Sequence, residues 1–199
     1  MGKLGFYVLA IVAAGCALLL SPGVTHADSL TGSVGITWLD PNTSTIAFAG
    51  ATDTIAVGSS LSCPGTSPIC APFSGIPGTE TFSVGLSAIS YIFSNVGGAY
   101  DNSPGTTFNG FDFTGLTFLS GGSLTGFTLT TDIAGLSNSA VTFGPSFIEI
   151  NLQGLPVDGH FTLNLTSSGA TAIPEPSSLV LLATGLFGLV GFMGRKAIA

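Results

Sequence analysis

Basic side chains are nearly absent from this chain of 199 residues, which has three Lys and Arg in all, Lys3, Arg195 and Lys196. Ten Asp and Glu give a formal net charge of −7, and charged residues make up 7% of the sequence. An ordinary globular protein has about 25%. Binding to phosphates requires Lys or Arg, so the composition excludes nucleic acid as a partner. The interior of the chain must be stabilised by apolar burial and backbone hydrogen bonds.

The residue types that carry enzymatic chemistry are also scarce. His160 is the single histidine after residue 27, and no serine lies in a G-x-S-x-G motif. Two carboxylates could act as a glycosidase pair, but the sequence singles out no such pair. We therefore expect a protein that is not an enzyme and that binds no cofactor.

The acids offer one alternative, a calcium site, because calcium takes carboxylate and carbonyl ligands. No D-x-D-x-D loop is present, and scattered acids at strand edges are usually solvated. We expect no metal site among the candidates, which are Asp101, Asp112, Asp132, Glu149 and Asp158.

The N-terminus has the pattern of a secretory signal peptide. Lys3 precedes an apolar run from Leu4 to Leu20, and a Pro-Gly break and small residues follow, which predicts cleavage after Ala27. The alternatives are an uncleaved membrane anchor and a lipoprotein box ending at Cys16. The apolar run continues past Cys16, where a lipoprotein would turn polar, so we favour the signal peptide over residues 1–27.

The C-terminus contains a second apolar run. Residues 177–193 carry no charge and as a helix would be about 26 Å long, close to the roughly 30 Å of a bilayer core. Arg195 and Lys196 follow it, and basic residues favour the cytoplasmic side. We predict a transmembrane helix with its C-terminal end inside and with residues 28–172 exported.

The tripeptide Pro174-Glu175-Pro176 stands directly before this span. Two prolines keep the backbone extended, in a form that the groove of a processing enzyme can bind. From Ile173 to the C-terminus, the order of motif, apolar span and basic residues resembles the PEP-CTERM sorting tail. A plain anchor with an incidental PEP is the alternative.

This resemblance implies a fate for the protein. Exosortase, an integral membrane enzyme, would recognise Pro174, Glu175 and Pro176, cleave near them and pass the protein to the cell surface or the extracellular matrix. Arg195 and Lys196 would stop transfer. The resemblance implies a Gram-negative bacterium that makes exopolysaccharide.

Residues 28–172 alternate between apolar and polar side chains at period two, as strands with one buried face do. The alternating runs predict strands at residues 34–38, 46–48, 82–86, 111–113, 127–129, 148–152 and 161–165. Turn signals rich in Gly, Pro and Asn separate the runs. We predict an all-β domain, a β-sandwich or a jelly roll, with Phe residues in the core and Trp38 packed. Residues 114–118 and 125–129 are expected to form one hairpin around Gly121-Gly122.

Cys63 and Cys70 remain after the signal is removed. An exported compartment is oxidising, so an even pair in a short loop predicts a disulfide. Zinc is the alternative, but two cysteines and His160 make an incomplete ligand set.

These observations favour a non-enzymatic surface or matrix protein with a structural or adhesive role. One alternative is a carbohydrate-binding module that retains matrix polysaccharide, which exposed Tyr91 or Tyr100 would favour. Another is self-assembly, because the strands lack the lysines that normally protect sheet edges.

Overall fold

A computed structural model describes residues 28–73, 78–94 and 97–169. These residues form strands and two short 3-10 helices, and the described part of the chain contains no α-helix. The elements in chain order are β1 (Leu30–Thr31), β2 (Ser33–Leu39), β3 (Thr52–Ala56), β4 (Ser59–Cys63), η1 (Pro68–Phe73), β5 (Thr79–Val84), β6 (Ala88–Ser94), β7 (Gly110–Thr114), β8 (Thr117–Phe118), β9 (Leu124–Thr131), η2 (Asn138–Ala140), β10 (Val141–Gly144), β11 (Phe147–Asn151) and β12 (Gly159–Ser167).

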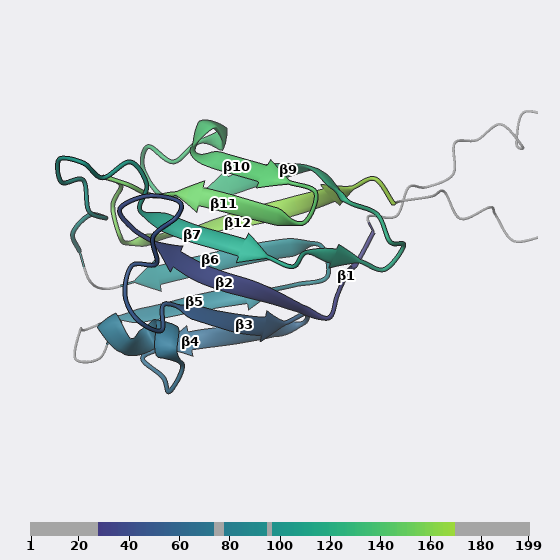
Figure 1. The fold of residues 1–199 in the computed structure, drawn as a ribbon, viewed down its shortest axis with the longest axis horizontal. Coiled ribbons are helices and arrows are strands. Elements are labelled where there is room, and N and C mark those ends of the chain that lie inside the picture. The colour runs from purple at the N-terminus through teal and green to yellow at the C-terminus, as the bar shows by residue number, and fades with distance from the viewer. Residues whose placement is uncertain (1–27, 74–77, 95–96, 170–199) are drawn as a thin grey trace, which may run out of the picture. The chain divides into compact units, whose positions relative to one another are not determined.

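Two five-stranded antiparallel sheets form the body (Figure 1). One has the strand order β10-β11-β7-β2-β3 and the other β4-β5-β6-β12-β9, and β1 pairs separately with β8. The chain passes between the sheets at their edges, from β3 to β4 and from β9 to β10, and also from β6 to β7 and from β11 to β12. The all-β prediction is confirmed, and the architecture is a β-sandwich.

The inward side of each strand supplies the core, as the period-two alternation predicted. The Phe111 ring on β7 lies 4.9 Å from the Phe82 ring on β5 and 5.3 Å from the Tyr91 ring on β6, between centroids, so these three side chains join the two sheets. In the part of the chain that the structure describes, seven phenylalanines are buried, namely Phe82, Phe93, Phe108, Phe111, Phe113, Phe118 and Phe161. Burying each contributes roughly 1.5–3 kcal/mol.

Trp38 packs against this core, as predicted. Its ring meets Phe48 edge-on at 5.8 Å between centroids. Its indole Nε1 donates a hydrogen bond to Asn109 Oδ1 at 2.9 Å, which satisfies the polar end of the side chain.

The predicted hairpin around Gly121-Gly122 is wrong. Residues 117–118 form β8, which pairs with β1, while β9 pairs with β12 in the other sheet. Gly115 has a φ of +72°, and β7 ends just before it, so the backbone changes direction there and the two segments separate. The similar sequences of the segments reflect similar strand chemistry, not pairing.

The remaining predicted strands are present with two exceptions. Ile46 makes only an isolated bridge to Leu39, and Phe48 lies in the same loop. Leu86 lies beyond the end of β5 and is exposed.

Among the described residues, no helix is long and apolar enough to cross a membrane. The signal peptide, its cleavage point at Ala27, and the predicted span at 177–193 all lie outside those residues. The described residues fall within one compact unit, Ala27–Ala170.

Candidate functional site

The sorting residues predicted from the sequence, Pro174, Glu175 and Pro176, lie outside the described residues, as do Arg195 and Lys196. The structure places instead the two points at which the body joins its terminal segments. These are Asp28, the first described residue, and the end of β12 at Ser167.

Asp28 connects the two ends of the body. Its carboxylate accepts hydrogen bonds from the Ser167 hydroxyl at 3.2 Å, from the Ser120 backbone N–H at 3.2 Å, and from the Ser120 hydroxyl. These bonds stabilise the ionised form, so the pKa of Asp28 lies below its ordinary value, with the Ser120 hydroxyl as the largest cause. Both segments that continue outside the body therefore leave it from one place.

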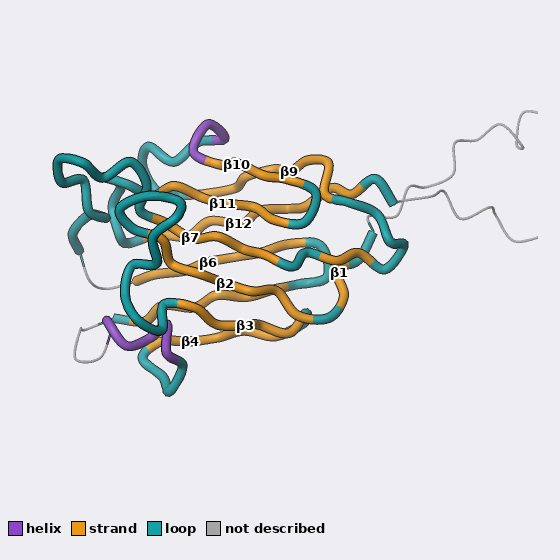
Figure 2. The backbone as a smooth tube through the Cα atoms, viewed as in Figure 1, coloured by secondary structure: helices purple, strands orange, loops and turns teal. Residues whose placement is uncertain are grey.

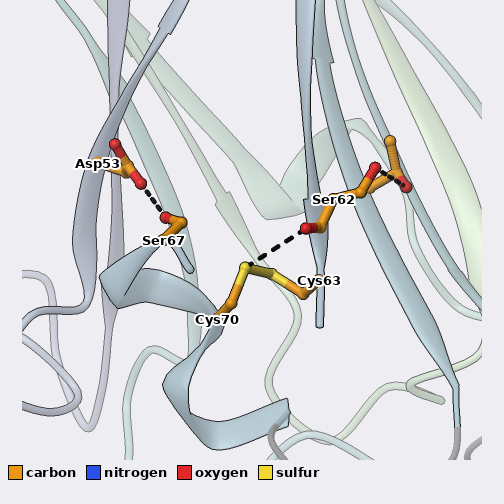
Figure 3. The surroundings of a disulfide bond; sticks show 6 residues. Asp53, Ser62, Cys63, Ser67 and Cys70 are labelled. Atoms are coloured by element: carbon orange, nitrogen blue, oxygen red, sulfur yellow. Dashed lines mark hydrogen bonds between the residues drawn. A yellow bond between two sulfur atoms is a disulfide. The ribbon is translucent and has the colours of Figure 1, made fainter. Parts of the chain in front are cut away.

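The Cys63–Cys70 disulfide is confirmed (Figure 3). It joins the end of β4 to η1, and Asp53 on β3 accepts a hydrogen bond from the Ser67 hydroxyl in the same loop. The short loop is therefore fixed to both strands at this edge of the sandwich. Because both thiols are used, the zinc alternative is excluded for these cysteines.

Glu80 is a buried acid that the sequence reasoning did not single out. It lies in the core between Cys63 on β4 and Phe93 on β6, with 1% of its surface exposed. Neither carboxyl oxygen has a hydrogen-bond partner of good geometry among the described residues. Burial raises its pKa to about 8, which the nearby Tyr91 hydroxyl offsets only in part. The sequence does contain a signal for this burial, because Glu80 stands at the same alternating positions as Phe82 and Val84, on the buried face of β5.

Tyr91 and Tyr100 are both buried, with 0% and 7% of their surfaces exposed. Their hydroxyls lie 2.5 Å apart and share a hydrogen bond. Burial raises the pKa of each well above the ordinary value of a tyrosine. Neither ring is available as a surface on which a sugar could stack.

The candidate calcium ligands are dispersed. No group of three or more His, Cys, Asp or Glu that could hold a metal ion occurs among the described residues. Asp101 accepts hydrogen bonds from Ser103, and Asp132 contacts His160, with 2.7 Å between Asp132 Oδ2 and His160 Nδ1.

Asp112 and Glu149 are the one pair that the sheet brings together. They stand opposite each other on the outer face, on β7 and β11. Burial and the Glu149 charge raise the pKa of Asp112 to about 6.

The outer face of the second sheet carries a row of hydroxyl groups. Register places one Ser or Thr on each of its five strands, in the order Ser60, Ser83, Ser90, Thr162 and Thr130. Their side chains point away from the core, because side chains alternate along a strand and the neighbours of these residues are buried, or, in the case of Leu61 and Leu129, pack against the core. The row is uncharged and can both donate and accept hydrogen bonds.

Comparison with known proteins gives one match. A family model described as the PEP-CTERM protein-sorting motif matches residues 172–196. This confirms the resemblance that was drawn from the tail. No curated protein and no solved structure matches the chain. The chain thus carries a PEP-CTERM sorting motif, which supports an exported protein that exosortase sorts from the membrane.

Proposed function

We propose that this chain is a non-enzymatic cell-surface or extracellular-matrix protein, with a structural or adhesive role in an exopolysaccharide matrix. The observation that carries the proposal is the sorting motif at residues 172–196, which supports an exported protein that exosortase processes. In this account, a Gram-negative cell removes the signal after Ala27, and exosortase reads Pro174, Glu175 and Pro176. Arg195 and Lys196 hold the tail in the membrane until cleavage.

The body suits an extracellular environment in three respects. Its core is apolar apart from Glu80, and it is built without Lys or Arg. The disulfide fixes one edge of the sandwich and is stable under oxidising conditions. Asp28 and Ser167 bring both ends of the body together. A body whose two chain ends are on the same side can fold while a segment at that side is still held in the membrane.

The test is replacement of Pro174, Glu175 and Pro176 by alanine in the full chain, expressed in a cell that has exosortase. We expect the variant to stay uncleaved in the inner membrane while the wild type reaches the cell surface. Ala197→Ser, in the same tail but outside the motif, is the control and should be processed normally. Unchanged processing of the triple variant would contradict the proposal.

A carbohydrate-binding module remains the second candidate. The row of hydroxyls on the second sheet favours it, because hydroxyl groups can hydrogen-bond to sugars. The burial of Tyr91 and Tyr100 counts against it, because stacking platforms require exposed rings. A glycan array probed with the released protein tests this candidate, because a carbohydrate-binding module should give a signal on it and the absence of any signal would remove the candidate.

A further inference from the structure

Leu119 and Leu86 are the large apolar side chains with the greatest exposure among the described residues, at 74% and 63%. Single exposed leucines are common on protein surfaces. These two, however, lie in turns that are bonded to the first residues of the body. Leu119 N donates a hydrogen bond to the Ser29 carbonyl oxygen at 2.8 Å, and Leu30 N donates one to the Leu86 carbonyl oxygen at 2.6 Å.

The same turns are bonded to the last residues of the body. Leu165 N donates to the Ser87 carbonyl oxygen at 2.8 Å, and Ser168 N donates to the Ser123 carbonyl oxygen at 2.9 Å. We use "exit end" for this part of the sandwich, defined as residues 28–30, 85–87, 119–123 and 167–169. Figure 2 shows that the long loops gather at the other end, away from β1.

The length of chain beyond the exit end keeps it close to a membrane. Residues 170–176 separate the body from the apolar run that starts at Ser177. Seven extended residues reach about 25 Å at most, and a less extended chain reaches less. While the span 177–193 is in the bilayer, the exit end is the part of the body that its tether holds nearest to the lipid surface.

Charge is distributed unevenly between the two ends. Asp28 is the one acid among the residues of the exit end. Four acids lie at the opposite end of the sandwich from the exit end. Asp40 follows β2, Asp132 follows β9, and Asp158 precedes β12. Asp101 lies in a loop that is bonded to the same end, because Thr107 N in that loop donates a hydrogen bond to the Pro41 carbonyl oxygen. An anionic membrane surface repels that far end and repels the exit end much less.

We propose that the exit end is a membrane-contacting surface, in which Leu86 and Leu119 insert into the interface of the bilayer that holds the span 177–193. The proposal rests on the proposed function, because it requires the anchored form of the protein. The two leucines lie on turns that are rich in Ser and Gly and carry no charge of their own, so they can enter the interfacial region while water and headgroups still solvate the Asp28 carboxylate. The acidic end then faces away from the lipid. The contact ends when exosortase releases the body.

The experiment places an environment-sensitive NBD label on the anchored full chain in phosphatidylcholine–phosphatidylglycerol vesicles. The label is attached to Leu86→Cys or Leu119→Cys, each combined with Cys16→Ala so that the introduced thiol is the one free cysteine. Ile46→Cys is the matched control, because Ile46 is 52% exposed and lies in the loop after β2, at the far end. Lipids carrying a nitroxide then quench labels that touch the bilayer.

We expect nitroxide lipids to quench the labels at positions 86 and 119 about threefold more than the label at position 46. Equal quenching at all three positions, in chains that float with the vesicles, would overturn the membrane contact and leave the anchor intact. A label that is shielded from water but not quenched by lipid would mean contact with a second copy, and would also overturn it. A chain that fails to float would contradict both this inference and the proposed function.

Discussion

The Ser167 hydroxyl donates a hydrogen bond to the Asp28 carboxylate across 139 positions of sequence, at 3.2 Å. This contact brings the start and the end of the sandwich together. The predicted signal peptide and the sorting motif are therefore joined to the same end of the body. Because the two ends are adjacent, a short linker should be able to join them.

Joining the two ends should leave the fold intact. A circular permutant with a short Gly-Ser linker between Gly169 and Asp28, opened in the exposed loop 102–105, is expected to fold. Its far-UV circular dichroism should match that of the unpermuted body. The control opens the same joined chain inside β6, which is central in its sheet, and should not fold. Loss of folding in the loop permutant would contradict the described position of the two ends.

Glu80 should make the protein less stable as the pH rises. Its pKa is about 8 in the folded chain and near 4.5 in the unfolded chain, so between these values only the folded chain holds the proton. The free energy of unfolding therefore falls between pH 4.5 and pH 8, by about 5 kcal/mol, and is then level. Glu80→Gln should raise stability at pH 8 and leave it unchanged at pH 4, as measured by urea unfolding.

The control for Glu80 is Glu149→Gln, which removes the same charge from the outer face. Burial raises the pKa of Glu149 as well, but that side chain is only half-buried, so the gain at pH 8 should be much smaller. If Glu80→Gln has the same pH profile as the wild type, then Glu80 is not a buried acid that holds its proton.

The disulfide should stabilise the edge formed by β3 and β4. Closing the short Cys63–Cys70 loop is worth about 2.5 kcal/mol in the chain-entropy model. Replacing both cysteines by alanine is expected to lower the free energy of unfolding by about this amount. Reduction of the wild type should cost a similar amount. A variant as stable as the oxidised wild type would show that η1 is held by its other contacts alone.

Gly110 should tolerate no side chain. A Cβ at this position in β7 would overlap the Ile150 carbonyl oxygen on the neighbouring strand β11. We expect Gly110→Ala to cost about 3 kcal/mol or more in thermal or urea unfolding. Gly126→Ala is the matched strand control, since its added Cβ would meet Thr166 at 4.0 Å. Equal stability of the two variants would contradict the close pairing of β7 with β11.

The sequence was most informative where one strand face is buried. Alternation in residues 34–38, 148–152 and 161–165 predicted strands that the structure contains, because period-two burial is a local property of a strand. The Cys63–Cys70 disulfide was predictable because the two cysteines lie in one short loop and an exported protein folds under oxidising conditions. The sorting tail was recognisable because its three parts occur in a fixed order, and the family model finds it.

Pairing was less predictable, because it depends on distant contacts. The segments at 114–118 and 125–129 are close in sequence and similar in pattern, yet they do not pair with each other. The first contains β8, which pairs with β1, and the second lies in β9, which pairs with β12. Strand β6 was missed because Ile92 is apolar and faces outward, which hides the alternation of Ile89, Tyr91 and Phe93. The burial of Tyr100 follows from its hydrogen bond to Tyr91, which no local pattern reveals.

The intact mass of the protein collected from the cell surface tests the central claim most directly. The account predicts a chain that begins at Asp28, ends before Ser177, and is two hydrogens lighter than its reduced form because Cys63 and Cys70 are joined. A surface protein with the mass of all 199 residues would contradict export and processing through the two terminal segments.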